Sequence, residues 1–340
     1  MTRPLVLITG GAEFLGGNLC RLLLARGYSV RSLDITAFNH PERDRVDVML
    51  VDVRDQRIVD LAMRGVSFVV HAASAPASSN AEEIYSTGVN GTWTVLRTAV
   101  RRHVARFVYL SSTTVYGAQT HGLMNESDPL QGTGPRAEAY IDAEYMCQQA
   151  RLIGSNISIL RLTDCVGPEP GDTLRKLYDF ARVGRHFPVL GRGCDAYQLL
   201  DIEDVCEAIC LCLSMRGDLV NDIFNLGSSG PATLRESFQA VLDRAGHGKR
   251  ILPIPTLAAV VLGLLRRLPG GSALQWLRDT ADRKSHVSVR HIGVRLGFRP
   301  RYSTRDALLR NYEAYLCEHP KEGVRNDVAT SRATMWMKAS

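Results

Sequence analysis

Lysine is absent from the first 175 residues of this 340-residue chain, where arginine supplies almost all of the positive charge. Arginine stays protonated at physiological pH, so it does not relay protons as a lysine can. The net charge of +6 is scattered along the chain and is not concentrated in one run. Without a basic cluster, we expect no binding to nucleic acid.

Long apolar runs and a secreted cysteine framework are also lacking. The longest apolar run, at 257–265, is too short to cross a bilayer, so no membrane span is predicted. Cys206, Cys210 and Cys212 fall on one predicted helix, where packing is favoured over metal binding. We therefore expect reduced thiols, no metal site and a cytoplasmic location.

Short β-branched runs alternate with helical patterns through the first half of the chain. Strands are predicted at 4–9, 28–34, 46–53, 66–73, 105–112 and 157–162, with helices near 14–26, 81–103 and 137–152. This alternation predicts an α/β fold, a Rossmann-type doubly wound parallel sheet, over residues 1–167.

The pattern changes after residue 167. Residues 168–316 are expected to form a smaller, mainly helical lobe that binds substrate, with some chain returning to the sheet. Residues 317–340 are polar and aperiodic, and we expect them to be disordered. The apolar segment 255–277 is interpreted as a core or dimer-contact helix; a hydrophobic lid and a membrane-surface contact through Arg266 and Arg267 are the alternatives.

A glycine-rich turn follows the first predicted strand and opens the first helix. Backbone N–H groups around Gly10, Gly11 and Gly16 are then placed to face a pyrophosphate. Asp34 ends the next strand, where its carboxylate can accept both hydroxyls of a ribose and would repel a 2′-phosphate. The pattern predicts a dinucleotide site that prefers NAD to NADP.

The motifs TGGAEFLG, VDVRD, HAAS, SSTTVYG and RLTDCVGP occur in this order, with a tyrosine on a helix between the last two. As a set they resemble the extended short-chain dehydrogenase/reductases, the NAD-dependent epimerase/dehydratase group, over about residues 4–316. The resemblance implies an enzyme that binds NAD and acts on a small molecule, and we expect a homodimer. It places these residues at the cofactor: Gly10, Gly11, Glu13, Phe14, Leu15, Gly16, Asp34, Asp52, Val53, Ala73 and Ser74.

The resemblance also supplies candidate catalytic residues. Ser112 matches the hydroxyl that orients substrate, and Tyr140 matches the tyrosine that moves a proton. Members of the family carry a lysine four residues after that tyrosine, but this chain has Glu144. Positions four apart share a helix face, so the expected cation is replaced by a carboxylate, which would make Tyr140 a poorer base.

Two further positions depart from the family pattern. Glu13 replaces a glycine of the pyrophosphate turn, so it would either repel the phosphates and weaken NAD binding or turn toward solvent. Gly88 stands where the family has an asparagine that orders the active site. Together with Glu144, these changes question the usual redox cycle, whereas the fold is not in question.

Substrate contacts are expected from Thr113, Thr114, Tyr116, Asp164 and Tyr197. The two threonines stand where sugar 4,6-dehydratases carry an acidic pair, which disfavours that subclass. Tyr197 stands where many nucleotide-sugar enzymes have an arginine on the diphosphate, which weakens that assignment unless Arg192 or Arg182 compensates.

Three hypotheses follow from these residues. In the first, the protein is an NAD-binding enzyme that acts at a hydroxyl or carbonyl carbon, as a reductase or like an epimerase/dehydratase, with Ser112 orienting the oxygen and Tyr140 as the acid. In the second, it is a non-redox isomerase, lyase or cyclase with Glu144 as the base and Tyr140 as the acid. In the third, it is an inactive nucleotide-sensing or binding protein.

Overall fold

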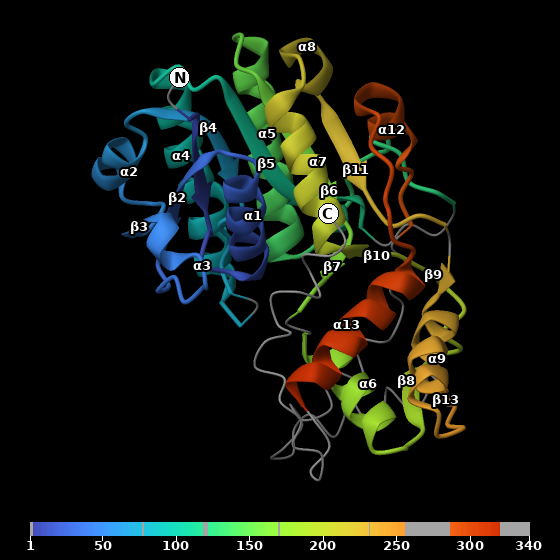
Figure 1. The fold of residues 1–340 in the computed structure, drawn as a ribbon. Coiled ribbons are helices and arrows are strands. Elements are labelled where there is room, and N and C mark those ends of the chain that lie inside the picture. Colours follow the sequence, from blue (N-terminus) through green and yellow to red (C-terminus); the bar gives the residue numbers. More distant parts are fainter. Residues whose placement is uncertain are drawn as a thin grey trace.

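The computed structural model describes residues 3–76, 78–117, 122–168, 171–230, 232–255 and 286–319. Its centre is a parallel seven-stranded sheet in the order β11-β6-β5-β4-β1-β2-β3 (Figure 1). The strands are β1 (Leu5–Thr9), β2 (Ser29–Asp34), β3 (Asp47–Leu50), β4 (Val66–His71), β5 (Arg106–Ser112), β6 (Ile157–Leu162) and β11 (Ile223–Leu226). The predicted Rossmann-type fold is confirmed.

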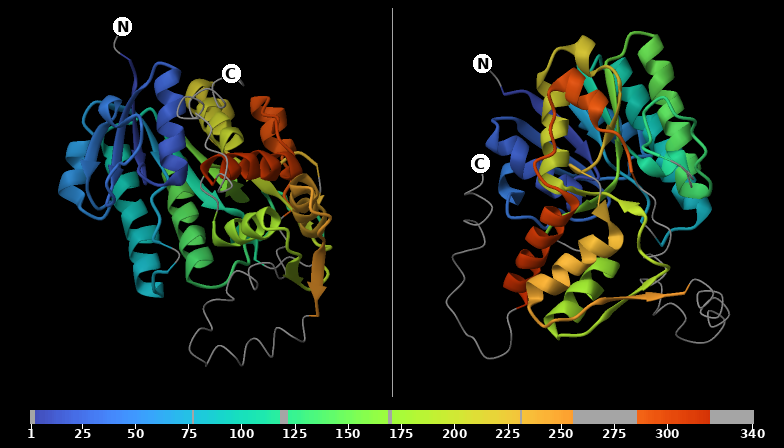
Figure 2. Two further views of the ribbon diagram at one scale, coloured as in Figure 1. Left: turned by 60° about the horizontal axis from the view of Figure 1, so that its bottom comes forward. Right: turned by 90° about the vertical axis from the view of Figure 1, so that its right-hand side faces the viewer.

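Side chains alternate across the sheet, which gives it two apolar faces. Val6 and Ile8 of β1 join one core with α1 (Phe14–Ala25), α7 (Ile202–Ser214) and α12 (Arg290–Leu296). Leu7, between them, joins the opposite core with α2 (Gln56–Ala62), α4 (Thr92–Arg101) and α5 (Pro135–Leu152). Figure 2 shows helices on both faces of the sheet. Such double burial explains why the strands are almost continuously apolar.

The helix predicted near 81–103 is one helical segment with an irregular middle. It comprises α3 (Ala81–Tyr85), a π-helical stretch η2 (Ser86–Gly91) and α4. The π-helical stretch includes Gly88, one of the positions that depart from the family pattern. Two 3₁₀ turns, η1 (Arg43–Arg45) and η3 (Thr113–Tyr116), complete this half of the chain.

A smaller lobe lies beside the carboxyl ends of the strands, at the bottom of Figure 1. Aromatic and aliphatic side chains of its helices and short strands make a separate core. Its elements are α6 (Asp172–Arg182), β8 (Phe187–Leu190), β9 (Ala196–Tyr197), β12 (Ala232–Thr233), α9 (Leu234–Ala245), β13 (Ile251–Ile254) and α13 (Thr304–Glu318). β7 (Asp164–Val166) and β10 (Leu199–Asp201) form a parallel pair that links the lobe to the sheet.

The chain crosses back to the sheet twice after residue 167. The first return comprises α7, α8 (Gly217–Val220) and the edge strand β11, and the second is α12. Cys206, Cys210 and Cys212 are buried in α7, in the core that α7 shares with α1. The division into two domains at residue 167 stays a prediction; the last strand of the large sheet before it is β6, which ends at Leu162.

The predictions for the apolar segment and for the C-terminal tail concern residues that the structure does not describe. Residues 256–277 of the apolar segment, with Arg266 and Arg267, and residues 320–340 of the tail lie outside the described residues. Within the described ranges, no helix is both long enough and apolar enough to cross a membrane. The same part of the chain holds no cluster of His, Cys, Asp and Glu side chains suited to a metal ion.

Candidate functional site

The strand order reverses direction between β1 and β4, and a pocket opens there at the carboxyl ends of the strands. From β1 the chain winds outward through β2 and β3, then returns to the other side of β1 as β4. Ligands of open α/β sheets bind at this type of switch point. The lining comprises Gly10, Glu13, Leu33, Asp34, Ile35, Thr36, Val51, Asp52, Val53, Arg54, Ala73, Ser74, Ala75, Pro76, Glu83 and Thr87.

Seven of the eleven predicted cofactor residues line this pocket, and the other four support it. Gly10 has φ +70°, and a Cβ on it would meet the backbone of Ala73 at 2.9 Å. A Cβ on Gly16 would lie 2.3 Å from the Gly10 carbonyl oxygen, so the α1 terminus approaches the turn closely. Gly11, Phe14, Leu15 and Gly16 do not line the pocket. The glycines are needed for the close approach of backbone to backbone.

Phe14 packs away from this pocket. A Cβ on Gly167 would lie 2.4 Å from the tip of the Phe14 ring, so the ring rests directly on the backbone at the end of the RLTDCVGP motif. Leu15 packs against the core that α1 shares with α7. These two side chains hold α1 in place beside the pocket and are not part of its lining.

Asp34 is held in place by the glycine turn itself. Its two carboxylate oxygens accept hydrogen bonds from the backbone N–H groups of Ala12 and Thr36, each at 2.9 Å. The residue is buried, yet it lines the pocket at the end of β2. Each carboxylate oxygen has a second lone pair, so the side chain can still accept hydroxyl groups from a ligand.

The lining of the pocket contains more carboxylates than cations. Arg54 binds Asp52 through Nε and Nη2, the latter at 2.5 Å, and reaches Glu83 through Nη1 at 3.1 Å. The guanidinium lowers the pKa of Asp52, mainly through this hydrogen bond. Among the described lining residues, four carboxylates, Glu13, Asp34, Asp52 and Glu83, face a single cation, Arg54. The pocket therefore carries net negative charge.

Glu13 occupies the N-cap of α1 and lines the same pocket, although it is exposed as a whole. Its side chain makes no capping hydrogen bond. Partial burial raises the pKa of Glu13, the charge of Asp34 raises it further, and Arg136 opposes both effects. The charge of Glu13, in the cofactor turn, therefore interacts with the charge of Arg136 on α5.

Tyr140 lies one helical turn after Arg136 on α5, so the two share a face. Burial has the largest effect on the Tyr140 phenol and raises its pKa, and the charge of Glu13 raises it further. The charge of Arg136 and a hydrogen-bond contribution from it lower the pKa, but the net pKa is still raised. Arg136 Nη2 also donates to the carbonyl oxygens of Ala75 and Pro76, each at 3.0 Å. This guanidinium therefore joins α5 to the loop after β4 that lines the pocket.

Glu144 lies in the core, where it is fully buried. Arg161, on β6, donates to its carboxylate from Nε at 3.0 Å and from Nη2 at 2.7 Å, and Ser111 Oγ donates to it at 2.5 Å. A carboxylate bound in this way is not open to a substrate. This burial argues against the hypothesis that Glu144 is a base in the active site, which stays a prediction.

Tyr116 belongs to the same buried network and not to a substrate pocket. It is fully buried, accepts a hydrogen bond from Arg161 Nη1 at 2.8 Å and donates to Asn225 Oδ1 at 2.7 Å. Tyr197 is likewise buried, in the core of the lobe against Phe238. This burial argues against a contact of these two tyrosines with substrate, and their predicted role stays a prediction.

The remaining candidates surround the carboxyl ends of β5 and β6. Ser112 caps η3, and its Oγ accepts hydrogen bonds from the backbone N–H and the hydroxyl of Thr114 at 3.2 and 3.1 Å. Thr114 and Asp164 are exposed, whereas Thr113 is almost buried. None of these four lines the pocket described above, so the structure leaves their predicted roles at the substrate untested.

Two arginines of this region escaped the sequence analysis. Arg161 interrupts the apolar run ISILRL, and a cation in a buried strand signals a buried partner. Arg136 lies four residues before Tyr140, but attention to the family lysine directs the search to the following turn.

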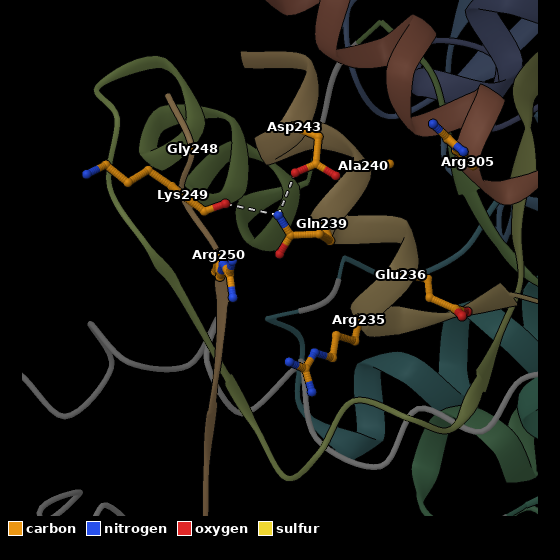
Figure 3. A pocket seen from close by; sticks show the side chains of 9 residues that line it. All are labelled: Arg235, Glu236, Gln239, Ala240, Asp243, Gly248, Lys249, Arg250 and Arg305. Atoms are coloured by element: carbon orange, nitrogen blue, oxygen red, sulfur yellow. Dashed lines mark hydrogen bonds between the residues drawn. The ribbon is translucent and has the colours of Figure 1, made fainter. Parts of the chain in front are cut away.

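A second, open depression lies on the surface of the lobe, over α9 and β13 (Figure 3). Gln239 donates from Nε2 to Asp243 and to the Lys249 carbonyl. The hydroxyl of Thr233, the N-cap of α9, accepts a hydrogen bond from the Glu236 backbone N–H. Its lining comprises Arg235, Glu236, Gln239, Ala240, Asp243, Gly248, Lys249, Arg250 and Arg305, all from the lobe. It contains none of the motifs that carry chemistry, so the pocket at the strand ends is the candidate site.

Comparisons with known proteins identify the family of the chain. The family model described as "NAD dependent epimerase/dehydratase family" matches residues 6–227. An uncharacterized protein, y4nG, of Sinorhizobium fredii is 27% identical over 91% of this chain and 78% of its own length. A dTDP-glucose 4,6-dehydratase of Streptomyces niveus is 26% identical over 91% of this chain and 92% of its own. The crystal structure of a Thermotoga maritima UDP-glucose 4-epimerase with UDP-glucose has a TM-score of 0.77 at 19% identity, covering 93% of this chain and 99% of its own.

Proposed function

The chain belongs to the NAD-dependent epimerase/dehydratase family, and on that premise we propose that it binds NAD(H) and acts as an enzyme at a hydroxyl or carbonyl carbon of a small molecule. The observation that carries the proposal is the pocket at the β1/β4 switch point, with Gly10 on one side and Asp34 at the end of β2. A glycine turn beside a carboxylate at the next strand end is suited to a dinucleotide.

The charges of the pocket favour NAD over NADP. Asp34 accepts hydroxyl groups but repels a 2′-phosphate, and Arg54 is already bound by Asp52 and Glu83. The 2′-phosphate of NADP would therefore enter a negatively charged pocket that offers no free cation among its described lining residues. The same carboxylates are expected to weaken dinucleotide binding in general, with Glu13 contributing through its place at the α1 terminus.

Tyr140 is proposed as the proton donor. Bound NADH would supply a hydride to a carbonyl carbon, and the carbonyl oxygen would take the phenol proton of Tyr140, which solvent then replaces. The raised pKa of Tyr140 keeps the phenol protonated at neutral pH, which suits donation better than abstraction. The direction proposed is therefore reduction, with Ser112 orienting the oxygen.

Nucleotide sugars are the first substrates to test, since relatives carry UDP-glucose and dTDP-glucose in their names. Two features weaken this choice: Tyr197 is buried, and Arg182 has its Nε buried without a hydrogen-bond partner and lies near Tyr312 and Tyr315 in the lobe. Arg192 is exposed and stays a candidate for a diphosphate. The proposed substrate class is accordingly broader: a small molecule with a hydroxyl or carbonyl group.

Titration with NADH and NADPH tests the cofactor proposal directly. We expect the purified protein to bind NADH at least about tenfold more tightly than NADPH, because Asp34 discriminates against the 2′-phosphate. Asp34→Asn removes the charge and should reduce the difference in affinity between NADH and NADPH. Asp47→Asn, on the exposed surface of β3, should leave that difference unchanged. Equal affinities, or no binding by the folded protein, would contradict the proposal.

A second candidate is a protein that binds dinucleotide without turning it over. It is favoured by Glu144, which stands at the family's lysine position and is occupied by Arg161. Single-turnover mixing of the NADH-bound protein with a panel of aldehydes, ketones and nucleotide sugars separates the two. Loss of NADH absorbance with any member supports the enzyme; binding without loss across the whole panel supports the binding protein.

A further inference from the structure

Arg136 and Tyr140 form a pair on the face of α5 that is directed toward the cofactor loops. They are four residues apart on one face of the helix, and the charge of Arg136 lowers the pKa of the phenol. The guanidinium is fixed from the other side, because its Nη2 donates to the Ala75 and Pro76 carbonyls. Both carbonyls belong to pocket-lining residues. The cation is thus held between the loop after β4 and the proposed acid.

The charge at the position of the expected lysine is engaged in the core and is not among the named causes that shift the pKa of Tyr140. Glu144 lies on the buried face of α5, and its carboxylate accepts hydrogen bonds from Nε and Nη2 of Arg161 and from Ser111 Oγ. The groups that act on Tyr140 come from three other places: Arg136 on its own helix, Glu13 from the glycine turn and Cys165 from β7. Tyr109, on β5, is the remaining titratable neighbour.

Cys165 and Tyr109 are neutral in this environment. Burial raises the pKa of the Cys165 thiol to about 12, and burial also raises the pKa of Tyr109 well above its usual value. Arg136 and Glu13 are therefore the groups charged at neutral pH among those named as shifting the pKa of Tyr140. They have opposite signs and come from different elements, α5 and the N-cap of α1.

We propose that Arg136 is the positioning residue for Tyr140, supplying from one turn before the tyrosine the positive charge that relatives place one turn after it, and that Glu13 moderates this charge. Arg136 acts through Tyr140 and does not itself exchange a proton, because a guanidinium stays protonated. When Tyr140 gives its proton to a carbonyl oxygen, the phenolate left behind is stabilised by Arg136 until solvent returns a proton.

This inference rests on the proposed role of Tyr140 as the acid, but it is tested without any substrate. Tyr140 is replaced by 3,5-difluorotyrosine, whose phenol titrates well below that of tyrosine, and its ¹⁹F resonance is followed against pH. One fluorinated residue avoids overlap with the other tyrosines. Failure of NADH to bind would overturn the proposed function and leave this titration unaffected, so the two failures are distinguishable.

The expected result is a charge-dependent shift of the titration midpoint. Arg136→Gln should raise the midpoint by about one pH unit, because a favourable charge is lost, and Glu13→Gln should lower it. Arg136→Lys retains the charge and should stay within about 0.3 unit of the parent. Arg97→Gln, an exposed change on α4 beside Trp93, is the control and should not move the midpoint.

Two outcomes would overturn the inference. In the first, the Arg136→Gln protein is folded, as shown by circular dichroism, and the titration midpoint of residue 140 is unchanged. In the second, Arg136→Lys shifts it as far as Arg136→Gln, which would mean that the guanidinium contacts to Ala75 and Pro76 matter and the charge does not. If Arg136→Gln does not fold, Glu13→Gln decides, since an unmoved midpoint there contradicts the charge pairing.

Discussion

At the scale of single residues, burial decides what an ionisable side chain can do. Glu13 and Glu144 are both carboxylates at positions where the resemblance leads us to expect another residue. Glu13 lies at the rim of the pocket beside Asp34 and Arg136. Glu144 is enclosed in the core with Arg161. The first can influence a ligand, whereas the second holds α5 against β5 and β6.

Introducing the family's lysine at position 144 is expected to damage the protein and not to restore a catalytic set. Glu144→Lys places two cations together in the core, because Arg161 has no second carboxylate there among its described hydrogen-bond partners. We expect a loss of about 3–5 kcal/mol in the free energy of unfolding, measured by urea denaturation.

Matched variants separate this effect from a general intolerance of α5. Asp142→Lys, on the exposed side of the same helix, should change the stability by less than about 0.5 kcal/mol. Replacing both partners, Glu144→Leu with Arg161→Leu, should recover much of the loss, since no charge is then left unpaired. A fully stable Glu144→Lys protein would contradict the buried pair.

His71 makes the stability of the protein depend on pH. Its ring is fully buried between the hydroxyls of Thr9, at 2.6 Å, and Thr92, at 2.9 Å, and burial lowers its pKa from 6.5 to about 4. The unfolded chain therefore binds more protons than the folded one between these values. Stability is fully present above pH 6.5 and is lost as the pH falls toward 4.

At pH 5 the contribution of His71 to this loss is about 2 kcal/mol relative to pH 7.5. Urea denaturation at the two pH values measures it, and His71→Asn, which does not titrate, should show a correspondingly smaller difference. Other groups titrate in both proteins, so the comparison isolates His71. An identical pH dependence in both would mean that the imidazole is not held neutral.

At the scale of elements, α5 is positioned by a close contact with the π-helical stretch η2. A Cβ built on Gly88 would lie 3.2 Å from the Cβ of Ala139, which is closer than such contacts ordinarily are. Ala139 precedes Tyr140 on α5. Gly88 thus allows the turn of α5 that carries Arg136 and Tyr140 to approach η2 closely. This contact gives a structural reason for a glycine at position 88.

Restoring a larger side chain at this contact should push α5 outward. Gly88→Asn is expected to cost about 1–3 kcal/mol of stability and to shift the titration of Tyr140, because the spacing between helices changes. Ala139→Gly opens the space again, so the double variant should be more stable than the sum of the two single changes predicts. A double-mutant cycle measured by urea denaturation tests this, and simple additivity would argue against the contact.

At the scale of the whole molecule, a buried carboxylate joins the lobe to the sheet. Asp204, in the first turn of α7, accepts hydrogen bonds from the backbone N–H groups of Arg301, at 3.0 Å, and Tyr302, at 3.2 Å, just before α13 begins. Arg310 of α13 adds an ion pair with Asp201 at 3.0 Å. These contacts tie the last helix of the lobe to the helix that returns to the sheet.

Asp204→Ala should destabilise the protein by about 2–3 kcal/mol, because two backbone donors lose their acceptor in a buried place. Asp218→Ala, on the exposed surface of α8, is the matched control and should be nearly neutral. The affinity for NADH should be the same in both, since the pocket belongs to the sheet. A neutral Asp204→Ala would show that the two parts associate without this contact.

The sequence alone determined the sheet, the switch point and most of the pocket. Apolar strand runs, glycine turns and an aspartate at a strand end are local signals, since each follows from what neighbouring residues need. The predicted cofactor residues include Gly10, Asp34, Asp52 and Ala73, and all four line the pocket.

Only the tertiary structure decided the partners of the charged side chains. Glu144 is paired with Arg161, which is 17 residues away, and Tyr116 with Asn225, which is 109 away. Spacing along one helix says which residues share a face, but not which strand that face covers. The electrostatics of Tyr140 therefore depend on contacts that no local pattern contains: Arg136 fixed by the loop after β4, and Glu13 brought across from the first turn.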